Sequence, residues 1–371
     1  GEYWNGERIA PEAAYPVSLV GSDTPRQAFR TIVVAANIAA GGDTAAALVF
    51  LPLLTYDGPP TDAAARQARR VAFYRLLDMS TFRLARIPDE DADGDGIVRF
   101  PIGPAGTDAT FEVEMRQADD GRWRLAMPTM EVMEDATARF LAAAGADSYG
   151  DFVLRRRDSP RGAMRRFLTG VANWDGGGAQ HALATMDLSD VPPALYAVNA
   201  PLFADYLRQI VDRVGYVVWQ EIPDDPARAD PYVYYSHAAG DIVIDAERST
   251  DGNANWRFTS ETIEAAPAVF EAIQELPIAQ GLLPPEPFSQ YFGLRQWVKS
   301  ISPALLERDF LIARWQWIAL AVTFVVALAA AALARPVVHG ARRFLPGMSA
   351  DKTADDGRDG PANAIRLIVV G

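Results

Sequence analysis

The sequence predicts an α+β protein in which two tandem duplicated domains precede a single transmembrane helix. Three observations predict this fold class: the helix opening DTPRQAF (23–29) returns as DSPRGAM (158–164), the same order of helical and alternating segments follows both openings, and a long apolar run extends from Trp315 to Ala334. Runs of helices followed by runs of strands are typical of α+β domains with an antiparallel sheet. We expect each domain to be a curved sheet of about four strands wrapped on helices, a cystatin-like or nuclear-transport-factor-like roll.

Length and composition leave room for this organisation. The 371 residues suffice for two or three domains, and a hydrophobic content of 49% suffices for sizeable cores. The net charge of −13 argues against nucleic acid as a partner, because binding phosphates requires a basic face. The absence of cysteine excludes disulfides, thiolate chemistry and cysteine-bound zinc.

Both ends of the sequence indicate a piece of a longer protein. It begins GEYWNGER, without a basic or an apolar leader, and it stops at IRLIVVG, soon after an apolar run begins. We expect that a signal peptide has been removed and that residues 1–20 form an N-terminal extension.

The predicted duplication consists of repeat 1 (21–148) and repeat 2 (149–278). Each repeat opens with a hydroxyl that can cap a helix and a proline that fits its first turn, as Ser159 and Pro160 do in repeat 2. Further phrases recur after about 135 residues: Ile-Pro-Asp at 87–89 and 222–224, and Trp-Arg at 123–124 and 256–257.

Within each repeat, helices are expected before and after the strands. The earlier helices include Asp62–Met79 and Leu202–Val214, and the closing helices are Met130–Ala143 and Glu261–Ile273. Alternation of apolar and polar residues predicts strands in these segments: FRLARI, IVRFPI, TFEVEMR and RWRLAM in repeat 1, and YVVWQEI, YVYYS, DIVIDAE and NWRFT in repeat 2.

The apolar run predicts one membrane-spanning helix over residues 313–336. Two polar residues interrupt about 20 apolar ones, which suffice to cross roughly 30 Å of hydrocarbon. The predicted membrane-interface anchors are Arg314, Trp315, Trp317 and Arg335. The alternative is a buried helix of a soluble core, although such helices are rarely so long and so uniformly apolar.

Basic residues predict the orientation of this span. Arg335, Arg342 and Arg343 follow it in a short segment, which is the usual signature of the cytoplasmic side. We therefore predict a bacterial inner membrane protein with a periplasmic N-terminal region. A proline-containing helical connector (279–312) would join the repeats to the span. Residues 337–371 would form a cytoplasmic basic and polar linker and the start of a truncated apolar segment.

Three segments that suggest binding sites are interpreted more simply. The glycines of DGGGAQHA (175–182) have a counterpart in AAGGDTAA of repeat 1, so both are interpreted as helix-to-helix connections rather than phosphate sites.

The second segment, DEDADGDG (89–96), places Asp91, Asp93 and Asp95 as in the first half of a calcium loop, but Ile102 stands where the loop needs Glu. We interpret it as a solvated acidic hairpin turn, with calcium binding as the alternative. The third, RRRDSPRGAMRR (155–166), is interpreted as a solvated connection; contact with anionic lipid or with the acidic neighbouring repeat is its alternative.

The sequence contains no recognisable catalytic motif. His181, His237 and His339 are far apart, and no HExxH, GxSxG, Walker or GxGxxG motif occurs in a suitable context. We predict a protein that is not an enzyme and that has no cofactor, no metal site and no small-molecule substrate.

The order of several short phrases resembles the extracytoplasmic N-terminal region of a branch of the small-conductance mechanosensitive ion channel family. The matching phrases are Ser159-Pro160-Arg161, Met186-Asp187-Leu188-Ser189 and Trp256-Arg257-Phe258-Thr259, followed by the proline-rich LPPEPF and a span that starts with tryptophan. The resemblance covers roughly Arg155 to Val338.

This resemblance implies a homo-oligomeric channel that opens under membrane tension and releases osmolytes in hypoosmotic shock, with the lipid bilayer as partner and without a ligand. The family's pore-lining helix and cytoplasmic vestibule are not in this chain, so no pore-lining residue is implied. The alternative function is a membrane-anchored periplasmic sensor or ligand-binding domain of a signalling protein. A third, a membrane-tethered enzyme or assembly factor, would need a polar pocket in one roll.

Overall fold

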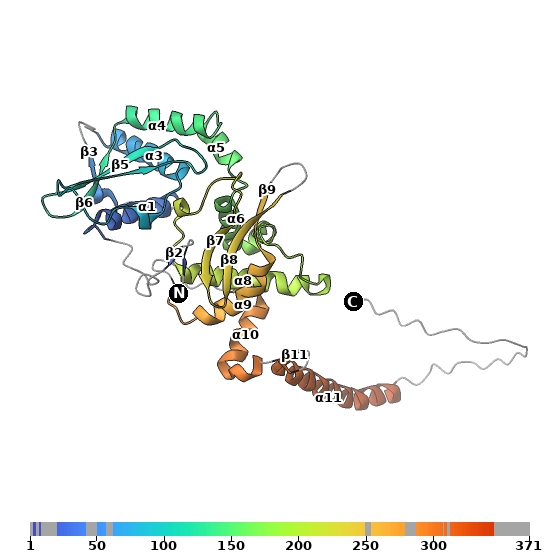
Figure 1. The fold of residues 1–371 in the computed structure, drawn as a ribbon. Coiled ribbons are helices and arrows are strands. Elements are labelled where there is room, and N and C mark those ends of the chain that lie inside the picture. The colour runs from blue at the N-terminus through green and yellow to red at the C-terminus, as the bar shows by residue number, and fades with distance from the viewer. Residues whose placement is uncertain are drawn as a thin grey trace, which may run out of the picture. The chain divides into compact units, whose positions relative to one another are not determined.

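The structure is a computed structural model that describes most of the chain. The described residues are 3–4, 7–8, 21–41, 50–56, 62–248, 254–278, 287–306, 308–309 and 312–344. The chain divides into two compact units, Gly1–Leu294 and Arg295–Gly371, which are taken in turn. The N-terminal unit is an α+β structure with two sheets (Figure 1).

The first half of the N-terminal unit contains a four-stranded sheet with the strand order β3-β6-β5-β4. The strands are β3 (Leu54–Tyr56), β4 (Ile97–Ile102), β5 (Phe111–Gln117) and β6 (Trp123–Met127). The pairing is antiparallel except between β3 and β6, which run parallel. The helical elements are α1 (Pro25–Ala40), η2 (Leu51–Leu53), α3 (Ala63–Met79), η3 (Leu84–Arg86), α4 (Met130–Ala143) and α5 (Tyr149–Arg155).

Local sequence explains why these elements form. Thr24 accepts a hydrogen bond from the backbone N–H of Gln27 (3.2 Å), which caps α1, and Asp62 caps α3 in the same way. Along β5 the buried residues are every second one: Phe111, Val113 and Met115. α1 lies against β5 and β6, and α4 packs on α3, so one apolar core forms in this half.

The second half contains a five-stranded sheet with the order β2-β1-β7-β8-β9, antiparallel throughout. Its later strands are β7 (Tyr232–His237), β8 (Gly240–Arg248) and β9 (Ala254–Phe258). The helical elements are α6 (Pro160–Ala172), the π-helical turn η4 (Trp174–Gly178), α7 (Ala179–Leu183), η5 (Pro193–Leu195), α8 (Tyr196–Val214), η6 (Trp219–Glu221) and α9 (Ser260–Ile273). α9 packs on β8 and α8, and a second apolar core forms here.

The N-terminal residues take part in the second sheet. β1 (Tyr3–Trp4) pairs with β7, and β2 (Glu7–Arg8) pairs with β1. The predicted extension over residues 1–20 therefore includes two strands. Strands of two residues are too short to show alternation, so the sequence does not reveal them.

Corresponding elements of the two halves keep one constant spacing. Each of the following pairs is 135 residues apart: Pro25 and Pro160, which begin α1 and α6; Met79 and Val214, which end α3 and α8; Leu84 and Trp219, which begin η3 and η6; and Ile97 and Tyr232, which begin β4 and β7. A residue on one of these elements therefore has a defined counterpart on the other.

Two predicted strands are wrong. FRLARI and YVVWQEI contain the short 3-10 turns η3 and η6 instead. Their backbone bonds between the halves: the N–H of Phe82 donates to the carbonyl of Gln220 (2.9 Å), and the N–H of Leu84 donates to Oε1 of Glu221 (3.0 Å). The alternation in these segments reflects turns covered by the other half and not a sheet.

The acidic segment DEDADGDG is not a hairpin turn, because a turn (η3) and not a strand precedes it. The carboxylate of Asp91 accepts hydrogen bonds from the backbone N–H groups of Asp93, Gly94 and Gly96, which folds the loop around it. Within the described part of the chain, no group of three or more acidic or histidine side chains is placed to hold a metal ion.

The C-terminal unit begins within α10 (Gln290–Ile301) and contains η7 (Pro303–Leu306), the small hairpin β10 (Arg308–Asp309) and β11 (Ile312–Ala313), and α11 (Arg314–Phe344). The predicted connector over 279–312 thus contains both helix and strand. α11 continues past the predicted span, so the first part of the predicted linker over 337–371 is helical. Residues 345–371 lie outside the described residues.

Candidate functional site

The apolar helix α11 carries the predicted membrane anchors. Among the described residues one helix is long and apolar enough to cross a membrane, the segment Arg314–Ala332, and none of it is buried. Arg314 and Trp315 are half-buried at its start, and Trp317 is exposed. Arg335 lies further along α11, where the side chains are outside the described part.

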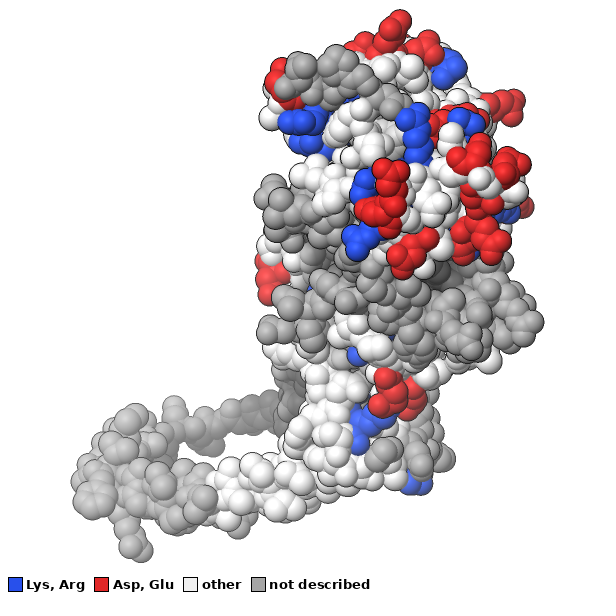
Figure 2. Space-filling model, turned by 90° about the vertical axis from the view of Figure 1, so that its left-hand side faces the viewer, with Lys and Arg blue, Asp and Glu red and all other residues white. Residues whose placement is uncertain are grey.

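The surface of this helix is uncharged. Its exposed apolar side chains include Ile318, Leu320, Val322, Phe324, Val325, Val326 and Leu328. In Figure 2 this surface is white, at the bottom of the view, whereas Asp and Glu side chains gather at the top with Arg side chains among them. An exposed apolar surface of this length needs a partner, either a bilayer or another protein.

A buried arginine, Arg161, joins the two halves of the N-terminal unit. It is 1% exposed, and its Nε donates to the carbonyl of Ile222 (3.0 Å) within its own half. Its two terminal nitrogens reach the first half, where they donate to the carbonyl of Asp78 (2.7 Å), the carbonyl of Ser80 (2.7 Å) and Oγ1 of Thr81 (2.8 Å). Asp224 lies 3.4 Å away and completes the ion pair.

Further polar contacts surround Arg161. Arg165 pairs with Asp78 (2.5 Å), and Tyr149 donates to the other carboxylate oxygen of Asp78 (2.7 Å). Asp224 accepts from the hydroxyl of Ser159 (2.7 Å), which also caps α6. The predicted solvated connection over residues 155–166 is therefore wrong: these arginines contact the neighbouring half, which was the alternative interpretation.

The electrostatics of this cluster favour the charged forms. Burial by itself would raise the pKa of Asp78, but the guanidinium groups of Arg165 and Arg161 and the hydroxyl of Tyr149 outweigh it and hold the pKa of Asp78 below its ordinary value. The same carboxylate and burial raise the pKa of Tyr149 to about 13 in direction, so the phenol stays protonated and keeps donating.

The repeated phrases account for this geometry. Arg26 in the first half donates from Nε to the carbonyl of Ile87 (2.9 Å) and pairs with Asp89 (3.1 Å), as Arg161 does with Ile222 and Asp224. The arginine of each helix opening thus binds the Ile-Pro-Asp phrase of its own half. Arg26 and Asp89 are more than a third exposed, whereas their counterparts are buried between the halves.

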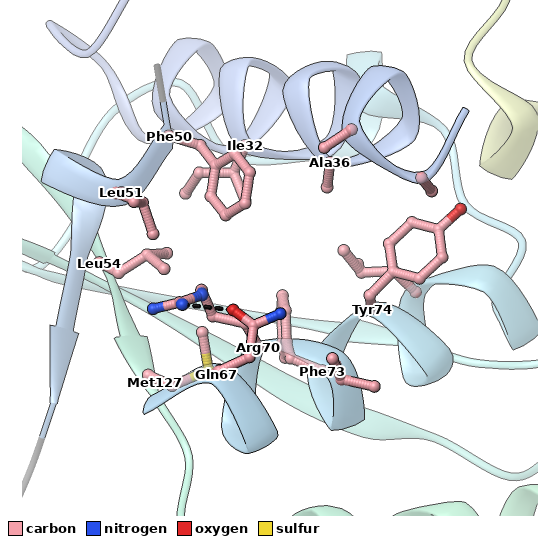
Figure 3. A pocket seen from close by; sticks show the side chains of 14 residues that line it. Ile32, Ala36, Phe50, Leu51, Leu54, Gln67, Arg70, Phe73, Tyr74 and Met127 are labelled. Atoms are coloured by element: carbon pink, nitrogen blue, oxygen red, sulfur yellow. Dashed lines mark hydrogen bonds between the residues drawn. The ribbon is translucent and has the colours of Figure 1, made fainter. Parts of the chain in front are cut away.

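The first half also contains an apolar pocket of about 280 Å³ between α1, η2 and α3. Figure 3 shows that α1 and α3 face one another across it. Its apolar walls include Ile32, Ala36, Phe50, Leu54 and Phe73. Arg70 and Gln67 bond to each other at its edge, and Arg70 also lies 3.5 Å from the hydroxyl of Tyr56.

Neither feature was identified from the sequence. The arginine cluster had a usable signal, because an arginine and an Ile-Pro-Asp phrase recur together at the same spacing in both repeats. The pocket also had one: Ala39 and Val71 of the first half correspond to Trp174 and Tyr206 of the second, so two large side chains are missing at equivalent positions. The described histidines, His181 and His237, belong to neither site.

Comparison of the chain with models of known protein families, with curated proteins and with solved structures finds no match.

Proposed function

We propose that this chain is the periplasmic N-terminal region and the first membrane span of a homo-oligomeric channel that opens under membrane tension. The observation that carries the proposal is the unburied apolar segment Arg314–Ala332 in a chain that also has a well-packed α+β unit. Its 19 residues are long enough for the hydrocarbon core of a bilayer. The phrases shared with the mechanosensitive channel family supply the class of function.

The proposal includes a tandem duplication of the two halves. Its support is the constant spacing of their elements and the equivalent contacts of Arg26 and Arg161. We propose that each half derives from one ancestral roll of cystatin-like or nuclear-transport-factor-like type. The clustered bonds of Arg161 would then make the two rolls one stiff body outside the membrane.

The pocket favours a second function, a membrane-anchored sensor whose N-terminal unit binds a ligand. Its volume of about 280 Å³ is close to the lower end of the range for small-ligand sites. A sensor would respond to that ligand without tension, and a channel would respond to tension without it.

Patch-clamp recording tests the two functions. The full-length gene product, expressed in spheroplasts of bacteria that lack mechanosensitive channels, is expected to produce currents under graded suction that empty-vector cells lack. Val325→Arg, which places a charge at the middle of the apolar segment, should abolish them, because a charge there costs about 3 kcal/mol.

The matched control is Leu154→Arg, which makes the same kind of change at a side chain that is 70% exposed in the N-terminal unit. This variant is expected to keep the wild-type current. Silence of the wild type close to the rupture tension, with the protein shown to be in the membrane fraction, would reject the channel and leave the sensor.

A further inference from the structure

The apolar pocket of the first half has a counterpart in the second half, and there the chain itself occupies it. The segment that follows α9 returns to the second half at Phe288 and Ser289. The ring of Phe288 stacks on Trp174, with 4.0 Å between ring centres and 18° between ring planes. The segment therefore lies where the end of α6 and the middle of α8 face each other.

Backbone hydrogen bonds hold this segment. The carboxylate of Asp205, on α8, accepts from the N–H of Ser289 (2.7 Å) and from that of Phe288 (3.4 Å). Phe292, one turn later, packs edge-on against Tyr206 with 5.1 Å between ring centres. One carboxylate and two aromatic rings thus form the receiving surface for an aromatic peptide segment.

The constant spacing of 135 residues identifies the equivalent positions in the first half. Trp174, Asp205 and Tyr206 correspond to Ala39, Arg70 and Val71. All three of these residues line the pocket of the first half. The described residues leave a cavity there because alanine and valine stand where the second half has tryptophan and tyrosine.

The edge of the pocket has the opposite charge to its counterpart. Asp205 accepts N–H groups, whereas Arg70 presents donors and pairs best with a carboxylate. The carboxamide of Gln67 beside it supplies the current acceptor, and it is a neutral group that a carboxylate replaces with a gain in charge pairing. An occupant that suits this pocket has an aromatic ring for the apolar walls and an acidic group next to it.

We propose that the first-half pocket binds an extended segment of a partner protein in which an aromatic residue is followed by Asp or Glu. The ring enters between Ile32, Ala36 and Phe50, and the acidic side chain bonds with Arg70. This inference depends on the pocket and on the equivalent segment of the second half. It holds whether the chain serves a channel or a sensor.

A labelled peptide tests the proposal. The probe is fluorescein-labelled PQPFDQYF, which copies residues 285–292 with Glu286→Gln and Ser289→Asp, so that it carries one acidic side chain next to the ring. With the full chain in detergent micelles, fluorescence polarisation is expected to show saturable binding. The peptide with lysine in place of that aspartate is expected to bind at least about tenfold more weakly.

Two variants of the chain localise the binding. Arg70→Glu should weaken the aspartate peptide about tenfold and restore binding of the lysine peptide, because the charge pair is reversed. Ala39→Trp introduces the second-half residue, fills the pocket and should weaken both peptides. Arg66→Glu, the same charge change at an exposed position of α3 that does not line the pocket, is the control and should bind like wild type.

The proposal is overturned if the wild type shows no saturable binding up to millimolar peptide, or if Arg66→Glu weakens binding as much as Arg70→Glu. It is also overturned if the chain self-associates in sedimentation runs and Ala39→Trp abolishes that association without any peptide binding. The occupant would then be a second copy of this chain.

Discussion

At the scale of single residues, Arg161 shows why arginine stands at this position. Its guanidinium makes five hydrogen bonds, to three backbone carbonyls, one hydroxyl and one carboxylate, and a planar fork of five donors matches such a set. Lysine has three donors on one nitrogen and cannot span these acceptors. The residue is therefore the central link between the two halves.

Arg161→Met is expected to destabilise the N-terminal unit by about 3–5 kcal/mol, because it leaves Asp224 and the carbonyls of Asp78 and Ser80 without their buried partner. Urea unfolding of the full chain in detergent, followed by tryptophan fluorescence, measures the loss. Arg26→Met makes the same change at the exposed counterpart and should cost less than about 1 kcal/mol. Equal losses would contradict the importance of burial.

Asp205 makes the stability of the second half depend on pH. Burial raises the pKa of Asp205 to about 6, although the N–H groups of Ser289 and Phe288 and the charge of Arg208 oppose the shift. Between the ordinary value for Asp, about 3.9, and 6 the folded state binds more protons than the unfolded state. This contribution to stability therefore falls as pH rises through that interval and returns as pH is lowered.

The comparison of wild type with Asp205→Asn isolates this effect. On going from pH 7 to pH 5 the unfolding midpoint of the wild type should rise relative to that of the variant, which cannot titrate at this position. Asp190→Asn, at an exposed position, is expected to follow the wild type across the same range. Parallel curves for wild type and Asp205→Asn would show that this carboxyl titrates as it does in water.

At the scale of elements, the close approach of α6 and α7 depends on glycine. A Cβ at Gly170 would lie 2.6 Å from the backbone nitrogen of Ala182 and 2.7 Å from the carbonyl oxygen of Gly178. The turn between the helices, at Gly177, has a φ of +97°, which also favours glycine. The triple glycine thus serves the helix-to-helix connection expected from the sequence.

Gly170→Ala is expected to destabilise the second half by about 1–3 kcal/mol, because its methyl group overlaps the backbone of the next helix. Gly293→Ala is the matched control, since a Cβ there meets no atom within 4 Å and α10 gains a better helix former. It should leave stability unchanged or raise it by about 0.5 kcal/mol. Thermal unfolding followed by circular dichroism compares the two, and a neutral Gly170→Ala would show that the helices can separate without cost.

At the scale of the whole molecule, the proposed orientation can be tested directly because the chain has no cysteine. A single cysteine introduced by Leu154→Cys, at an exposed position of the N-terminal unit, should react with a membrane-impermeant maleimide in cells whose outer membrane is permeable. Ser349→Cys, beyond the predicted span, should react only after the inner membrane is broken. The reverse pattern would contradict the periplasmic location of the N-terminal unit.

Much of the architecture can be derived from the sequence because its signals are local. The starts of α1 and α6 follow from a capping hydroxyl and a proline, and α4 has the predicted bounds Met130–Ala143. The strands β4 and β5 alternate as expected, because one face is buried. The apolar helix α11 is evident from length and composition alone.

Tertiary structure decides the rest, because contacts between distant residues leave no local pattern. FRLARI alternates like a strand, yet Leu84 bonds to Glu221 of the other half and forms a turn. Arg161 looks like part of a solvated basic segment until the first half covers it. The pocket exists because two helices far apart in sequence carry small side chains at facing positions, and their distance in space is set by the packing of the whole unit.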